Sequence, residues 1–221
     1  MTADAENPLC GGSPGDWDRL IETVGPASLL AVIEHRMSPA LRQRYAAEDV
    51  LQEALLYAWR DRARHEWRGI RSFRNWLLTI IDHRICDLAD QAQAEKRGGN
   101  VRFVHFSALS GAGGANPSLL PWSSTTPSRI AVYREQAAAM RAALASLPDD
   151  LRDVLRLRLF EQLPVEETAR RLNLGLSAVR HRFRRGAELY QRSLVAELGT
   201  RSLSISHLVL RGVLADSSPE E

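Results

Sequence analysis

Residues 163–186, "LPVEETARRLNLGLSAVRHRFRRG", have the pattern of two short helices joined by a tight turn. Pro164 can begin the first helix because its missing N–H is not needed in a first turn, and the glutamates that follow suit the positive end of that helix. Asn173 and Gly175 both tolerate the left-handed backbone of a tight turn, and Ser177 is a candidate N-cap for the second helix. This spacing predicts a helix-turn-helix.

The second helix of this motif has an apolar face and a basic face. Its apolar residues recur at intervals of three and four positions, which predicts a buried stripe made of Val179, Phe183, Ala187 and Tyr190. The opposite face carries His181, Arg184, Arg185, Glu188 and Arg192, with Arg180 at its edge. Residues 177–192 contain five arginines and one acid, so this helix is strongly basic.

The basic face has two interpretations. On an isolated helix, such arginines are typical of a surface that only faces solvent. On the second helix of a helix-turn-helix the outer face enters the major groove, where arginine binds guanine edges or phosphates. The position therefore favours duplex DNA binding by Arg180, His181, Arg184 and Arg185. We expect Arg182 to hold either a phosphate or a neighbouring helix.

Composition argues against several other classes of protein. The chain has 221 residues, of which 44% are hydrophobic and 25% charged, which is typical of folded globular domains. A formal net charge of +2 is too small to indicate nucleic-acid binding by bulk charge. Cys10 and Cys86 form no closely spaced pair, which argues against a disulfide framework and a zinc knuckle.

The sequence shows no pattern typical of a signal peptide or of a membrane-spanning segment. The first residues, "MTADAENPLCGGSPGDW" (1–17), have no basic stretch before an apolar core, so we expect no signal peptide. No apolar run approaches the roughly 18 residues that span a bilayer. We therefore expect a cytoplasmic protein without membrane insertion.

Glycine, proline and serine divide the chain into segments. The segments with hydrophobic periodicity have the helical period and lack the alternation of half-buried strands, which predicts an all-α protein. We expect two small helical domains joined by a flexible linker. The predicted parts are a flexible N-terminal tail at 1–15, a helical domain at 16–97, a linker at 98–128, a helix-turn-helix domain at 129–199 and a C-terminal extension at 200–221.

A narrow polar stripe runs along the otherwise apolar segment 46–60. Its members are Asp49, Gln52, Glu53 and Arg60. Two explanations are open. The acids can complement the positive start of a helix and keep its surface solvated, or the stripe can dock a partner through charge-assisted hydrogen bonds.

Aromatic residues and arginines alternate in the next segment, "HEWRGIRSFRNW" (65–76). The aromatic residues are Trp67, Phe73 and Trp76, and the arginines are Arg68, Arg71 and Arg74. This mixture suits unstacked bases and the backbone of a single strand. The alternative is that Phe73 and Trp76 belong to the core of the next helix, and for Phe73 we favour the core.

The helix that contains Phe73 continues with a clear division of faces. Leu77, Ile80, Ile81, Ile85 and Leu88 are predicted to pack inward, and Asn75, Thr79, His83 and Asp87 are predicted to face outward. His83, Cys86 and Asp87 lie one turn apart, as metal ligands can, but no further ligand is obvious. We therefore expect neither a metal nor a cofactor.

At these residues the sequence resembles a known family. "AEDVLQEALLYAW" (47–59) and "SFRNWLLTIIDHRICD" (72–87) resemble region 2 of bacterial RNA polymerase sigma factors, and "LASLPDDLRDVLRLRLFEQLPVEETARRLNLGLSAVRHRFRRG" (144–186) resembles region 4. The two regions follow each other without a region 3 between them. This arrangement is similar to the extracytoplasmic-function (ECF) group of the sigma-70 family.

The resemblance implies roles for particular residues. It implies that Asp49, Gln52 and Glu53 dock on the clamp helices of the largest polymerase subunit. The residues implied to bind the melted −10 element are Trp67, Arg68, Arg71, Arg74, Asn75, His83 and Asp87. Those implied to enter the major groove at the −35 element are Ser177, Arg180, His181, Arg184 and Arg185.

The function implied is that of a sigma factor, which binds core RNA polymerase and directs promoter-specific initiation. The partners implied are the clamp helices, the flap of the second-largest subunit, promoter DNA and possible anti-sigma factors. The alternative is a stand-alone helix-turn-helix regulator that does not depend on core polymerase. We expect no enzyme, because no paired carboxylates or nucleophile–base spacing occur beside a plausible pocket.

Overall fold

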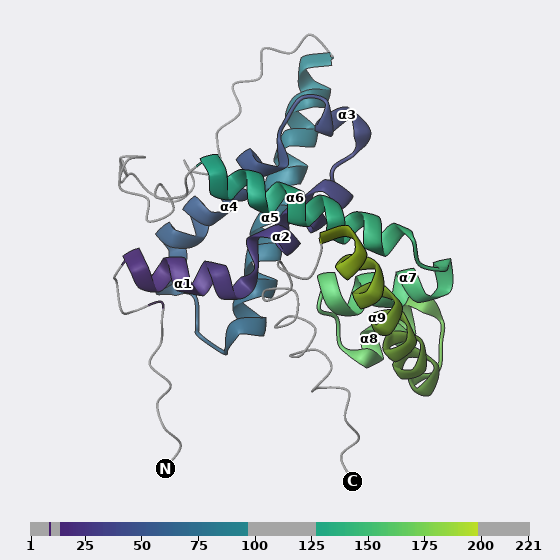
Figure 1. Ribbon diagram of the computed structural model, residues 1–221. Coiled ribbons are helices and arrows are strands. Elements are labelled where there is room, and N and C mark those ends of the chain that lie inside the picture. Colours follow the sequence, from purple (N-terminus) through teal and green to yellow (C-terminus); the bar gives the residue numbers. More distant parts are fainter. Residues whose placement is uncertain (1–8, 10–13, 97–126, 199–221) are drawn as a thin grey trace, which may run out of the picture. The chain divides into compact units, whose positions relative to one another are not determined.

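The structure is a computed structural model that describes residue 9, residues 14–96 and residues 127–198 (Figure 1). Within these ranges all regular structure is helical, which confirms the all-α class. The predicted C-terminal extension and all of the predicted linker except residues 127 and 128 lie outside the described residues.

Proline begins four of the helices. They are α1 (Pro14–Val24), α2 (Pro26–Arg36), α3 (Pro39–Arg42) and α6 (Pro127–Ala145). Proline suits a first turn, since its fixed φ is helical and its missing N–H would have no partner there. As a consequence, α1 includes the last two residues of the predicted tail, and α6 includes the last two residues of the predicted linker.

The chain divides into two compact units. The first comprises residues up to Val24 and from Ile33 to Ile130, and the second comprises Gly25–Val32 and the residues from Ala131 onward. The predicted first domain, 16–97, also includes Gly25–Val32. Each unit is described by itself below.

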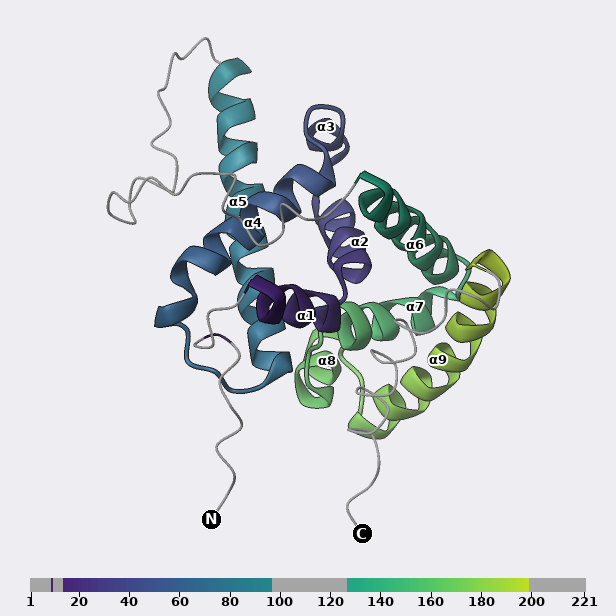
Figure 2. The ribbon, with the colours of Figure 1, turned by 60° about the vertical axis from the view of Figure 1, so that its left-hand side comes forward.

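The first unit is built on two helices that cross each other, α4 (Ala47–Asp61) and α5 (Ile70–Lys96), joined through the short 3₁₀ helix η1 (Arg62–Arg64) (Figure 1 and Figure 2). Residues at helical spacing form their shared core, which contains Val50, Leu51, Ala54, Leu55 and Ala58 of α4 and Phe73, Leu77, Ile81, Ile85 and Leu88 of α5. The predicted inward face of α5 is confirmed except at Ile80, which is partly exposed. Phe73 belongs to the core, as favoured.

Aromatic rings fasten α1 to this pair. The indole of Trp17 makes edge-to-face contacts with Trp59, at a centroid distance of 5.3 Å, and with Phe73, at 5.8 Å. This is the arrangement that the ring quadrupoles favour. Trp17 is 2% exposed, so the contact places the first turn of α1 in the core of the first unit.

Arg74, which the resemblance implies as a residue that binds the −10 element, does not lie on the surface. Its side chain is 2% exposed, and Nη1 donates a 2.9 Å hydrogen bond to the backbone oxygen of Val24. The guanidinium thus satisfies a carbonyl at the C-terminal end of α1, where no helical partner exists. Burial, with a smaller effect from Arg36, lowers the pKa of Arg74 to about 10, so it remains charged at neutral pH.

The second unit contains most of α6, α7 (Asp149–Leu155), the π-helical turn η5 (Arg156–Phe160), α8 (Val165–Leu172) and α9 (Leu176–Leu198). Pro148 separates α6 from α7. Arg152 stabilises this break, because its guanidinium donates hydrogen bonds to the backbone oxygens of Leu144, Ala145 and Leu147. These carbonyls belong to the last residues of α6 and to the residue directly before Pro148.

The predicted helix-turn-helix is present as α8 and α9. Asn173 has left-handed backbone angles (φ 51°, ψ 48°), which confirms its role in the turn. Two details differ from prediction. The first helix begins at Val165, with Pro164 as the preceding cap residue. Ser177 is not the N-cap of α9, because the backbone oxygen of Gly175 accepts the bond from the Val179 N–H, so Gly175 occupies the start of the helix.

Candidate nucleic-acid interface

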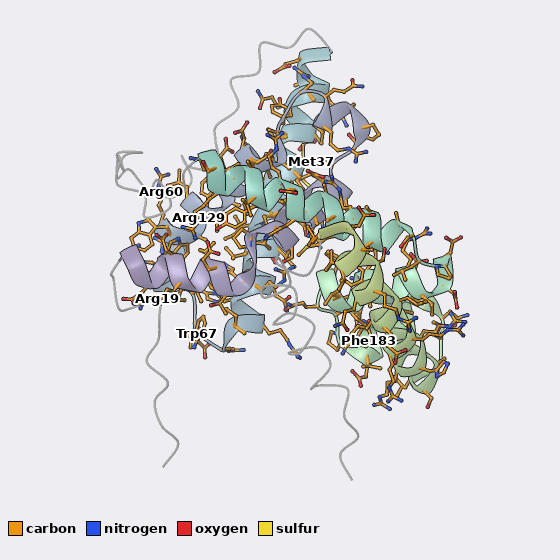
Figure 3. All side chains as sticks on the ribbon, viewed as in Figure 1. Arg19, Met37, Arg60, Trp67, Arg129 and Phe183 are labelled. Atoms are coloured by element: carbon orange, nitrogen blue, oxygen red, sulfur yellow. The ribbon has the colours of Figure 1, made fainter. Side chains whose placement is uncertain are left out.

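The outer face of α9 gathers the basic side chains predicted to bind duplex DNA. The inner face is fully packed, since Val179 is 0% exposed and Phe183, seen in Figure 3, is 1% exposed. Arg180, His181, Arg184 and Arg185 are all exposed, and Ser177 is exposed in the first turn of the helix. One rigid helix therefore presents these five side chains to solvent.

Arg182 differs from its neighbours. Its Nε lies 3.7 Å from Oδ2 of Asp150 on α7, and its side chain is 34% exposed. Of the two partners expected for Arg182, the structure shows the neighbouring helix. The ion pair turns the Arg182 guanidinium toward α7, while the buried Val179 and Phe183 fix which side of α9 faces outward.

The turn before α8 is braced by a buried arginine. Arg158 is 3% exposed and donates through Nη1 to the backbone oxygen of Leu163, directly before the helix-turn-helix. Its guanidinium also lies over the ring of Phe183, 5.5 Å from the centroid. Arg158 thus connects the start of α8 with the buried face of α9.

In the first unit, the segment between α4 and α5 presents aromatic and basic side chains. Trp67, labelled in Figure 3, is half-buried, and its ring lies 6.0 Å from Phe73. Arg68 is exposed and donates a 2.6 Å hydrogen bond to Glu66, which lowers the pKa of Glu66 and raises that of Arg68. Gly69 has a φ of 92°, a conformation that favours glycine, and it turns the chain into α5.

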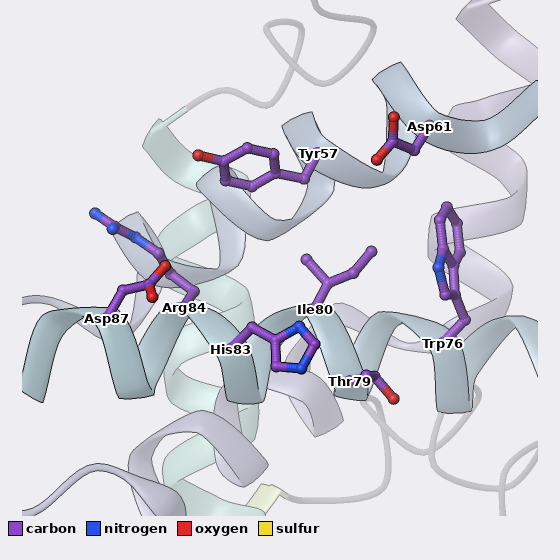
Figure 4. Close-up of a pocket in the computed structure, with 8 residues that line it drawn as sticks. All are labelled: Tyr57, Asp61, Trp76, Thr79, Ile80, His83, Arg84 and Asp87. Carbon is purple, nitrogen blue, oxygen red and sulfur yellow. The ribbon is translucent and has the colours of Figure 1, made fainter. Parts of the chain in front are cut away.

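A hollow of about 210 Å³ lies between α4 and α5 (Figure 4). Its lining comprises Tyr57 and Asp61 of α4 and Trp76, Thr79, Ile80, His83, Arg84 and Asp87 of α5. The hollow brings together two predicted site residues, His83 and Asp87. Asn75 is exposed about two turns before His83 on α5, and its backbone oxygen accepts a 3.1 Å hydrogen bond from Thr79 Oγ1.

The polar stripe of α4 has exposed members and a member that forms an ion pair with α5. Asp49 and Gln52 are exposed on one face of the helix. Glu53, on the same face, forms an ion pair with Nε of Arg84, whose side chain is only 12% exposed. Because Arg84 also lines the hollow, Glu53 connects the stripe with the hollow.

Comparison with known families now gives the identity of both units. Residues 28–95 match the family model of Sigma-70 region 2, and residues 137–188 match Sigma-70, region 4. The chain belongs to the sigma-70 family. Together the two matches cover more than half of the chain, and the second is to the type of region 4 that the ECF group carries. No curated protein sequence matches the chain.

These two regions give the sigma-70 chain a role in promoter recognition, and they imply interaction with core RNA polymerase and promoter DNA. Region 2 covers α4, η1 and α5, which carry the polar stripe and the hollow. Region 4 covers α7, α8 and the first part of α9. In the described parts of the chain, no helix is long and apolar enough to cross a membrane.

Sequence reasoning missed three residues of the region 2 surface of this sigma-70 chain. Tyr57 and Asp61 line the hollow from α4, although Tyr57 had the spacing of a core residue. The ring of His65 stacks on Trp76 at a centroid distance of 4.3 Å and an interplanar angle of 10°. The spacing of Tyr57 and Asp61, one helical turn apart, was an available signal, whereas no sequence pattern indicated the stacking of His65.

Proposed function

We propose that the chain binds core RNA polymerase and directs it to promoters, with region 4 binding the −35 duplex and region 2 opening and holding the −10 element. The observation that carries this proposal is the outer face of α9, which holds Arg180, Arg184 and Arg185 exposed on the second helix of a helix-turn-helix. This is the geometry in which side chains meet the base edges of a major groove.

The −35 element is bound, in this proposal, by Ser177, Arg180, His181, Arg184 and Arg185. Arginine can donate two hydrogen bonds to a guanine, and each good pair of this kind discriminates by roughly 1–3 kcal/mol against a wrong base. The remaining side chains position the helix on phosphates. Arg182 is left out of this set because it pairs with Asp150.

The −10 element is held as a melted strand by the loop that follows η1 and by α5. The hollow has an aromatic wall, Trp76, and polar groups around it, a combination that suits an unstacked base (Figure 4). Stacking is worth roughly 1–3 kcal/mol per base, which offsets an unpairing cost of a few kcal/mol. In this proposal Arg68 and Arg71, both exposed, bind the phosphates.

Core polymerase is bound by the polar stripe of α4, through Asp49, Gln52 and Glu53, on the clamp helices of the largest subunit. Region 4 contacts the flap of the second-largest subunit. The exposure of Asp49 and Gln52 supports this role, and Glu53 contributes while paired with Arg84. In this proposal the protein acts in the cytoplasm as a non-enzymatic initiation factor. Its domains are region 2 inside 16–97 and region 4 inside 129–199, joined by a linker at 98–128. An anti-sigma factor is a further partner.

Replacing Asp49→Arg together with Gln52→Ala is expected to weaken binding to core polymerase by about tenfold or more. The change removes an acceptor and a donor and places a positive charge where the partner is expected to be positive, and such interfacial charges contribute on the order of 2 kcal/mol or more when desolvated. Titration of the labelled chain with purified core polymerase measures the dissociation constant.

The matched control is Asp90→Arg with Gln93→Ala. It makes the same two changes at the same spacing on exposed positions of α5. We expect the control to bind core polymerase like the wild type. Equal affinity of the wild type and of the Asp49→Arg, Gln52→Ala variant would contradict docking through the stripe.

A further inference from the structure

The ring of His65 stacks on Trp76, one of the residues that line the hollow, although His65 is not itself a lining residue. It caps η1, and its backbone N–H donates a 3.3 Å hydrogen bond to the backbone oxygen of Arg62. Its ring lies 4.3 Å from that of Trp76 and is nearly parallel to it, with an interplanar angle of 10°. Trp76 lines the hollow, so the chain stacks one ring on the residue that forms the wall.

The contacts of Trp76 leave its indole little freedom. Its ring also contacts Phe73 at a centroid distance of 5.7 Å, and Phe73 itself is fully buried. His65 contacts Phe73 as well, at 6.1 Å. The three rings form a small cluster, and Trp67 of the same loop also contacts Phe73, at 6.0 Å, whereas His65 is the loop residue whose ring stacks on Trp76.

The stacked ring of His65 suits the neutral imidazole. Its Nε2 is buried and has no hydrogen-bond partner in the described structure. A proton on that nitrogen of a charged ring would meet no acceptor, and desolvation of the charge would oppose the stack.

We propose that neutral His65 is a positioning residue, which holds the indole of Trp76 as the wall of the hollow and so prepares the hollow for an unstacked base of the −10 strand. The proposal rests on the proposed function of region 2. A ring that is already fixed loses less freedom when a base stacks on it, so a fixed Trp76 binds the melted strand more tightly than a mobile one.

The charged groups around His65 do not reverse its preference for the neutral form of the imidazole. Burial lowers the pKa of His65 most strongly, Glu66 opposes this effect and Arg68 adds to it, while Glu66 and Arg68 are paired with each other. The other charged groups on the adjoining elements are Asp61 and Arg64, which lie 3.7 Å apart, Arg62, whose guanidinium lies over Trp59, and Arg71 and Arg74 of α5.

The sign of the pH dependence follows from the lowered pKa. A released loop takes up a proton near the ordinary histidine pKa of about 6.5, while the stacked ring takes it up only at lower pH. The stacked conformation is therefore favoured in full above pH ~6.5 and loses its advantage as the pH falls through the lowered pKa. Binding of a melted −10 strand should weaken over the same interval.

The test uses the full chain bound to core polymerase and a fluorescent promoter DNA whose −10 segment is already unpaired. The promoter is selected from a random library by the wild-type holoenzyme. Dissociation constants at pH 8 and pH 6 are compared for the wild type, His65→Ala and His65→Phe. Thermal unfolding by circular dichroism at both pH values identifies any variant that is not folded.

We expect His65→Ala to bind the pre-melted probe about tenfold more weakly at pH 8. A tenfold change corresponds to about 1.4 kcal/mol, which is within the roughly 1–3 kcal/mol that stacking of a base on Trp76 contributes. His65→Phe keeps a flat ring against Trp76 and is expected to bind within about twofold of the wild type. Because phenylalanine takes up no proton, this variant should lose the weakening that the wild type shows at pH 6. The control His35→Ala, at an exposed histidine outside the hollow, should keep both the affinity and the pH profile.

Three results would overturn the positioning role. They are wild-type affinity in His65→Ala, an equal loss in His65→Phe and His65→Ala, and the wild-type pH profile in His65→Phe. Failure of the proposed function looks different, because the wild-type holoenzyme would then show no preference for the pre-melted probe over the fully paired one.

Discussion

Replacing both Arg184 and Arg185 with alanine is expected to weaken promoter binding by the holoenzyme about a hundredfold or more. Both side chains are exposed on the outer face of α9, and neither helps to pack the helix. If each makes a base-edge or phosphate contact worth on the order of 1–3 kcal/mol, the two losses together amount to roughly 2–6 kcal/mol, and a hundredfold change corresponds to about 2.8 kcal/mol. The loss should fall mainly on promoters with an intact −35 element.

The measurement compares two promoters that differ only in a scrambled −35 element. The wild type should prefer the intact element, and the double variant should bind both almost equally. Removing phosphate contacts should also reduce the dependence of affinity on salt, by about one unit of slope per contact. The control for loss of positive charge is Arg134→Ala, at an exposed position of α6 in the same unit. An unchanged preference in the double variant would contradict −35 binding by α9.

Arg74→Ala is expected to destabilise the first unit by roughly 3–5 kcal/mol. The substitution leaves a buried carbonyl at Val24 without its 2.9 Å hydrogen bond, which costs about 1–3 kcal/mol. It also removes a large side chain from a packed site, and cavities of this kind cost several kcal/mol more. The free energy of unfolding in urea can be followed by tryptophan fluorescence, since four of the five tryptophans lie in residues 17–76.

Arg71→Ala is the comparison for Arg74→Ala. Arg71 is exposed one turn before it on the same helix, so its removal should change stability by less than about 0.5 kcal/mol. If Arg74→Ala unfolded at the wild-type urea concentration and lost only DNA affinity, Arg74 would be a surface contact, and its buried position would be wrong.

The contrast between Arg74 and its neighbours shows what periodicity can predict. The inward positions of α5 at Leu77, Ile81 and Ile85 follow from apolar spacing alone, and they are buried as predicted. Arg74 precedes Leu77 by three residues and Leu78 by four, so its register was that of the inward face. Because charged side chains usually lie on the surface, its residue type favoured an exposed position. The carbonyl of Val24 that holds it lies fifty residues away in sequence, and no local pattern reveals it.

The geometry of the candidate binding surfaces was predictable to a similar degree. The outer face of α9 followed from helical spacing, because a helix fixes which side chains share a face. The start of α9 was misplaced by residue preference, since glycine and serine both serve as caps and the turn placed Gly175 there. The pairing of Glu53 with Arg84 and the stacking of His65 on Trp76 depend on how α4, the loop and α5 meet. Such contacts arise from packing between elements and leave no periodic signal.

The most direct measurement is run-off transcription by purified core polymerase from a promoter selected by the chain. Transcripts from one defined start should form only when the chain and core polymerase are both present. They should be lost with Asp49→Arg and Gln52→Ala and retained with Asp90→Arg and Gln93→Ala. A stand-alone regulator would give the opposite pattern. The chain would then bind the promoter equally tightly with and without core polymerase, and adding the chain to core polymerase would produce no defined transcript.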